Sequence, residues 1–298
     1  MRFWKTLTKL SIGIVFAMLL MFALPSPARA AGLSLSPGRL ELEMNPGSER
    51  TFPLTAYYEK GEGVQPNARL VVRFNDWMMK PDGDIILSQP GLLPRSSANW
   101  LLVSPSEFLL PVGNSQPIRV TVSVPAGTKP GSYYAAIFIE ERTPPPTVNP
   151  GEKKVVLRYR LGTILYVLVP NVVRKGDLSS LSADAEAGKV VVKSVLKNMG
   201  NAHVRPNHQV EIKNAAGETV AETKPEDTPV LLPDSELDLQ IELPVKLPPG
   251  EYTLVYKIDF RDEKAVQVGK VSLTVAAAQS SPPDSAGLTQ VKSPPSQR

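Results

Sequence analysis

The stretch VVLRYRLGTILYVLV, residues 155–169, decides the fold of this chain. Every second position from Val155 is apolar except Thr163, which is the alternation of a β-strand with one buried face. At about 3.3 Å per residue such a strand spans roughly 50 Å, more than a small sandwich covers. Part of the strand is therefore expected to lie outside the core of its own domain.

The two parts of this stretch differ in their second face. Arg158 and Arg160 give the first part a solvated side, and we interpret them as charges that discourage aggregation. In the second part both faces are apolar, which predicts burial on both sides. A long apolar strand with an open edge invites pairing with another chain, so the sequence predicts a protein that binds polypeptides.

The N-terminus has the pattern of a secretory signal peptide. A basic start precedes the apolar run Leu10–Leu24 and a small-x-small cleavage site, Ala28–Ala30. The apolar run is shorter than a membrane span needs. We therefore predict a leader at residues 1–30, export to the periplasm and no stable membrane insertion.

Charge and cysteine content exclude several classes of function. The chain carries 33 basic and 29 acidic residues, but four basic residues and no acid lie in the predicted leader. A balanced mature chain gives no electrostatic reason to bind nucleic acid or an anionic membrane. The chain also has no Cys, so it is expected to be held by its cores without disulfides.

Short Val, Ile, Leu, Thr and Tyr runs are punctuated by 30 prolines and 20 glycines, which predicts an all-β protein. Eight strands at this spacing predict a β-sandwich within residues 31–173. The expected strands are Leu33–Met44, Thr51–Tyr58, Ala68–Asn75, Asp84–Ser88, Trp100–Leu110, Ile118–Val124, Tyr133–Glu141 and the long last one, Val155–Val169.

A second sandwich is predicted at residues 178–276, after the linker Val173–Asp177. Its expected strands are Lys189–Leu196, Gln209–Lys213, Leu237–Leu243, Glu251–Phe260 and Val266–Val275. The Ser-, Pro- and Gln-rich end, residues 277–298, is expected to be disordered.

Both halves contain a Pro-Gly turn followed two residues later by a tyrosine, Tyr133 or Tyr252. This pattern is similar to the corner of immunoglobulin-like sandwiches, where the tyrosine hydroxyl bonds to the backbone upstream. We therefore expect two immunoglobulin-like domains in tandem, with both tyrosines structural. The segment Lys80-Pro81-Asp82-Gly83 is a turn signal and predicts a hairpin.

The chain resembles the PapD-like periplasmic chaperones, which have two immunoglobulin-like domains and assist pilus assembly. The segment LSLSPGRL, residues 33–40, places Arg39 where that family carries an arginine on its first strand. Leu157, Tyr159 and Leu161 match the alternating apolar residues of the family's last strand.

The resemblance implies that this strand, with Val155, completes the fold of an unfinished subunit through donor-strand pairing. It also implies that Arg39 holds a carboxylate of the subunit. The family's second anchor, a lysine on the last strand, is absent here, and Tyr166 or a neighbour takes its place.

Catalytic and metal-binding patterns are weak. Both histidines, His203 and His208, lie in a Pro- and Asn-containing segment and are interpreted as loop residues rather than metal ligands. The segment Asp82–Asp84 is interpreted as a turn, because it lacks further calcium ligands. Trp77 and Trp100 end apolar runs and are expected in the core rather than on a binding platform. We expect no enzymatic activity and no cofactor.

The sequence thus predicts a periplasmic chaperone or assembly factor for pilus or surface-protein subunits. Its partners would be exported subunits. Whether an outer-membrane assembly platform is also a partner is left open. The alternative is a structural or adhesive immunoglobulin-like module of a cell-envelope assembly, in which the long strand is covered permanently.

Overall fold

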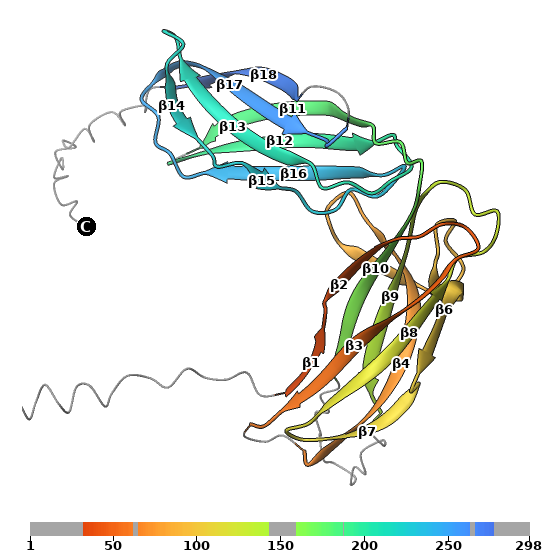
Figure 1. The fold of residues 1–298 in the computed structure, drawn as a ribbon. Coiled ribbons are helices and arrows are strands. Elements are labelled where there is room, and N and C mark those ends of the chain that lie inside the picture. Colours follow the sequence, from red (N-terminus) through yellow and green to blue (C-terminus); the bar gives the residue numbers. More distant parts are fainter. Residues whose placement is uncertain (1–31, 62–64, 143–158, 187, 263–265, 277–298) are drawn as a thin grey trace, which may run out of the picture. The chain divides into compact units, whose positions relative to one another are not determined.

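The computed structural model describes residues 32–61, 65–142, 159–186, 188–262 and 266–276, which form two compact units (Figure 1). The first unit comprises residues up to Trp77 together with Leu87–Asn171. The second comprises the hairpin tip Met78–Ile86 and the residues from Val172 onward. The predicted leader and tail, as well as Val155, Leu157 and Arg158, lie outside the described residues.

The first unit is a sandwich of two sheets. One sheet has the order β1 (Gly32–Ser36), β3 (Glu49–Glu59), β8 (Ser115–Ser123) and β6 (Leu101–Ser104). The other has the order β2 (Arg39–Glu43), β10 (Arg160–Val169), β9 (Gly131–Glu141), β4 (Asn67–Met79) and β5 (Ile85–Ser88), with β7 (Glu107–Pro111) also paired to β4. A short 3-10 turn, η1 (Ala98–Trp100), precedes β6.

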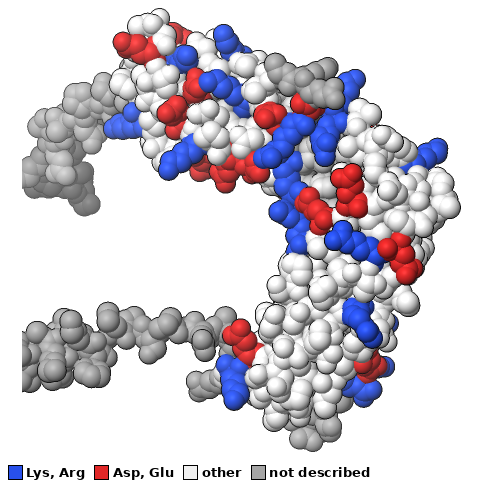
Figure 2. Space-filling model, viewed as in Figure 1, with Lys and Arg blue, Asp and Glu red and all other residues white. Residues whose placement is uncertain are grey.

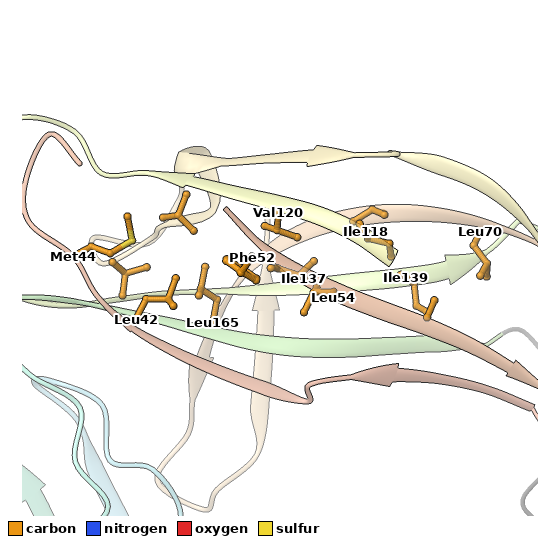
Figure 3. Close-up of a cluster of buried hydrophobic side chains, with 14 of the residues drawn as sticks. Leu42, Met44, Phe52, Leu54, Leu70, Ile118, Val120, Ile137, Ile139 and Leu165 are labelled. Carbon is orange, nitrogen blue, oxygen red and sulfur yellow. The ribbon is translucent and has the colours of Figure 1, made fainter. Parts of the chain in front are cut away.

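Alternate residues of both sheets point inward and make the core of the first unit (Figure 3). Leu54 and Ile118 come from one sheet, and Ile137 and Leu165 come from the other, all fully buried. Each such side chain contributes about 1.5–3 kcal/mol through burial. Leu165 and Tyr166, on opposite faces of the second part of the 155–169 stretch, are both buried, so the predicted burial of that part on both sides is confirmed.

Two strands that the sequence predicts as continuous are divided between the sheets. Leu33–Met44 breaks into β1 and β2, and Trp100–Leu110 breaks into β6 and β7. Each break lies at a proline, which lacks the N–H that a sheet ladder needs. The prediction of single strands was wrong because apolar residues occur on both sides of each proline, but the inward-facing ones change there from odd to even positions, from Leu35 to Leu40 and from Val103 to Phe108.

The second unit is also a sandwich. One sheet has the order β11 (Gly176–Glu186), β12 (Lys189–Asn198) and β16 (Glu236–Leu243). The other has the order β14 (Thr219–Glu222), β13 (Asn207–Asn214), β17 (Gly250–Asp259) and β18 (Gln267–Val275), with β15 (Glu226–Asp227) paired to β13. The sequence did not indicate β11, β14 or β15, which are edge or peripheral strands rich in polar residues.

Both predicted tyrosine corners are present. The Tyr133 hydroxyl donates to the Lys129 carbonyl at 3.1 Å, and the Tyr252 hydroxyl donates to the Pro248 carbonyl at 2.9 Å. The predicted turn between β4 and β5 also forms, with Gly83 at φ +88° and its N–H donating to the Lys80 carbonyl. An all-β chain of two immunoglobulin-like sandwiches is therefore confirmed.

Charged side chains are unevenly distributed on the face shown in Figure 2. They are sparse over β1, β3 and β8 of the first unit, whereas acidic and basic side chains are interspersed over the second unit. On this face the first sandwich offers a partner little charge to recognise.

Candidate functional site

The two parts of β10 have different neighbours. Strand β9 pairs with β10 along its whole length, from Arg160 to Val169. Strand β2 runs parallel to β10 on the other side, but its register covers only Ile164–Leu168. In the part of the chain that the structure describes, Arg160–Thr163 therefore have a paired strand on one side only. We call the other side the open edge.

The register identifies the backbone groups that face the open edge. The Glu141 N–H donates to the Tyr159 carbonyl at 3.0 Å, so the odd-numbered residues of β10 direct their backbone groups toward β9. The backbone groups of Arg160 and Gly162 consequently point to the opposite side. Among the described residues no strand pairs with them on that side, so an added strand could do so.

The start of β2 limits the open edge at one end. The buried Thr163 hydroxyl donates to the Pro37 carbonyl at 2.6 Å. The Ile164 N–H donates to the Gly38 carbonyl at 3.1 Å. An added strand could therefore extend along β10 only as far as Thr163, where the chain's own segment begins.

Two of the predicted partner-binding residues lie at this edge. The Tyr159 side chain is 43% exposed and lies beside β1, where a β-carbon placed on Gly32 would be 3.9 Å from its ring. Leu161 is half-buried and packs against the core of the first unit. The other two, Val155 and Leu157, lie outside the described residues.

Arg39 is the first residue of β2 and lies opposite Ile164, directly beyond the open edge. Its side chain is 58% exposed, and its Nε lies 3.5 Å from Glu41 Oε1. Tyr166, which with its neighbours was expected to stand in place of the family's lysine, is buried and packs edge-on against Trp77 with ring centroids 5.8 Å apart. Arg39 therefore lies at the end of the open edge, and Tyr166 does not supply a second positive charge beside it.

Arg160 differs from its interpretation as a purely solvated charge. Its guanidinium lies 4.0 Å from the centroid of the Phe138 ring. Its Nε is 2.8 Å from Glu140 Oε1, and it donates to Asn75 Oδ1 at 2.8 Å. Sequence reasoning missed these partners because they come from β9, which pairs with β10, and from β4, which pairs with β9, and this strand order cannot be read from alternation alone.

The remaining candidates are structural. Trp77 is 1% exposed, as predicted. Trp100 packs against Tyr133 beside the core of the first unit. His203 and His208 are both buried, and the interpretation of His208 as a loop residue was wrong, because it lies in β13. Within the described ranges, no cluster of three metal-ligating residues and no helix suited to crossing a membrane is found.

No family model and no curated protein matches this chain. Among solved structures, it is similar to a chaperone–tip adhesin complex of CFA/I fimbriae, with 12% identity, a TM-score of 0.44 and coverage of 83% of this chain and 100% of the other. It is also similar to the CsuC–CsuE chaperone–subunit complex of Acinetobacter baumannii Csu pili, with 15% identity, a TM-score of 0.39 and coverage of 82% and 99%. The CupB2 chaperone of Pseudomonas aeruginosa is similar with 11% identity, a TM-score of 0.39 and coverage of 80% of this chain and 100% of the other. Fimbrial chaperones are thus among the proteins that this chain resembles, as the sequence predicts.

Proposed function

We propose that this protein is a periplasmic chaperone or assembly factor that holds an exported β-rich subunit by pairing a strand of that subunit with the open edge of β10. The single observation that carries the proposal is the register of β2, which leaves Arg160–Thr163 paired on one side only within the described ranges. A strand added there would gain main-chain hydrogen bonds from Arg160 and Gly162.

Apolar contacts would add to the backbone pairing. Tyr159 is 43% exposed and Leu161 is half-buried, so both would lose contact with water when a strand covers them. Each side chain that becomes fully buried contributes roughly 1.5–3 kcal/mol before ordering costs. By the predicted alternation, Val155 and Leu157 would extend the same contact surface.

Arg39 would fix the end of the bound strand. A strand that runs parallel to β10, as β2 does, would end directly before Gly38 and Arg39. A terminal carboxylate at that end could accept two hydrogen bonds from the guanidinium. The existing contact with Glu41 is 3.5 Å long and exposed, so little energy would be lost in replacing it.

The test is a photo-crosslinking residue at position 159 in cells that export the protein, with adducts identified by mass spectrometry. A matched control carries the same residue at position 57, because Tyr57 is 41% exposed but lies on β3. An adduct with an exported β-rich subunit from position 159 alone would support the proposal. Self-adducts or no adduct, in cells that make exported subunits, would contradict it and favour a structural module.

A further inference from the structure

The ring of Phe138 lies across Gly162 on the outer face of the sheet. The two residues are directly opposite each other on β9 and β10. A β-carbon placed on Gly162 would be 2.6 Å from Cε1 and 2.9 Å from Cδ1 of Phe138. The ring therefore occupies the space that a side chain at position 162 would fill, and it extends from β9 over β10 toward the open edge.

Arg160 holds this ring in place. Its guanidinium lies 4.0 Å from the ring centroid, at the distance of a cation–π contact. The same guanidinium is bound by Glu140 and Asn75, each at 2.8 Å. Its charge is therefore already paired, and a strand that docks beside it meets a fixed aromatic surface rather than a free cation.

The open edge consequently has an apolar group on each face. Leu161 lies on the inner face, where it packs against the core, and Phe138 reaches the outer face across Gly162. Side chains of directly opposed residues on neighbouring strands lie about 4.5–5.5 Å apart at their β-carbons. A residue of the bound strand opposite Gly162 would therefore place its side chain against the edge of the Phe138 ring.

We propose that Phe138 and Gly162 form an apolar subsite that selects strands carrying a large apolar side chain on the outer face, in addition to apolar residues on the inner face. This inference rests on the proposed function and specifies its partner. A strand that is apolar on both faces is one that becomes buried on both faces in its finished fold. The subsite would thus favour interior strands of an unassembled β-protein over amphipathic edge strands.

The test uses the full mature chain and two synthetic peptides, Val-Thr-Val-X-Val-Thr-Val, in which X is Phe or Ser. Dissociation constants are measured by fluorescence polarisation. The wild type is expected to bind the Phe peptide about tenfold more tightly, because an aromatic contact adds to the buried area. Gly162→Ala displaces the ring and should reduce this preference to less than about twofold.

Phe138→Ala removes the ring without adding a side chain to β10 and should lose the preference in the same way. Leu109→Ala is the matched control, because Leu109 is an exposed apolar residue on β7, which joins the sheet at β4. It should keep the tenfold preference. Thermal denaturation of each variant shows whether the fold is retained.

The outcomes separate the two proposals. Equal binding of both peptides by the wild type, abolished by Tyr159→Glu, would overturn the subsite and leave edge pairing intact. An unchanged preference in Gly162→Ala and Phe138→Ala would also overturn the subsite. Binding of neither peptide would contradict edge pairing itself.

Discussion

The two sandwiches differ in how their strand edges are covered. In the second unit the side chain of Gln267, on β18, bridges to the opposite sheet: its Nε2 donates to the Gly176 carbonyl at 2.8 Å, and its Oε1 accepts from the Leu178 N–H at 3.1 Å. This amide ties β18 to the edge strand β11. In the first unit β10 keeps an open edge from Arg160 to Thr163 in the described chain.

This difference shows that an open edge is not a necessary consequence of the fold. The first unit has a segment that could continue beside β10, but Pro37 interrupts it and the preceding residues, β1, pair with β3 instead. The second unit places charges along another of its edge strands, β16, at Glu236, Asp238 and Glu242. Charges at edges discourage unwanted pairing. The first sandwich thus leaves part of a strand edge open, whereas the second one bridges or charges its edge strands β11, β18 and β16.

The largest effect is expected from Tyr159→Glu, which places a charge at the open edge. The fold should persist because Tyr159 is 43% exposed and is not part of the buried core. Capture of the partner identified by crosslinking should fall by roughly 100-fold, since a bound strand would have to desolvate the carboxylate. Co-purification of that partner from exporting cells measures the effect.

Tyr57→Glu serves as the matched substitution, since Tyr57 is equally exposed and faces away from β10. It should leave capture within about twofold of the wild type. If Tyr159→Glu unfolds the first unit instead, Tyr159 is a core residue and the edge is not a binding surface.

A smaller effect, on stability, is expected when the Gln267 bridge between β18 and β11 is removed. Gln267→Ala removes two hydrogen bonds, each worth about 1 kcal/mol, and should lower the free energy of unfolding of the second unit by about 2 kcal/mol. Outside the leader, the only tryptophans are Trp77 and Trp100, both in the first unit. Tryptophan emission therefore follows the first unit, whereas far-UV circular dichroism follows both.

The expected signature is a lower unfolding midpoint by circular dichroism with an unchanged midpoint by tryptophan emission. Gln240→Ala, on β16, is the control, because its exposed side-chain amide donates a long hydrogen bond, 3.4 Å, to Glu242 Oε1 of the same strand. Equal midpoints for wild type and Gln267→Ala would show that the bridge between β18 and β11 does not stabilise the second sandwich.

Local chemistry in the sequence predicts several features of both sandwiches. The tyrosine corners, the turn at Gly83 and the burial of Trp77 follow from turn signals and apolar runs. The burial of Leu165 follows from a strand that is apolar on both faces. These features depend on residues close together in the chain, so a single sequence is sufficient to predict them.

Features that depend on which strands become neighbours were not predictable. The chain crosses from one sheet to the other between β1 and β2, because β1 pairs with β3 and β2 pairs with β10. The contact of Arg160 with Phe138 requires the register between β10 and β9. Alternation fixes which face a residue occupies, but it does not identify the residue on the next strand.

The smallest effect concerns the core of the second unit, which contains a histidine. His208 on β13 is buried, and its ring lies 5.9 Å from that of Tyr256 on β17. Burial lowers the pKa of His208 because it disfavours the charged imidazolium, and Glu226 and Asp227 on β15 oppose this shift only in part. Burial also raises the pKa of the Tyr256 hydroxyl to about 12, so that tyrosine stays neutral.

The sign of the pH effect follows from the lowered pKa. As pH falls through about 6.5, the unfolded chain takes up a proton at position 208 before the folded chain does, so the free energy of unfolding decreases. The circular dichroism midpoint should therefore fall between pH 7 and pH 5, and His208→Leu should reduce that fall. A response that persists fully in His208→Leu would assign the pH dependence to other groups and leave the polar core of the second sandwich without a role in it.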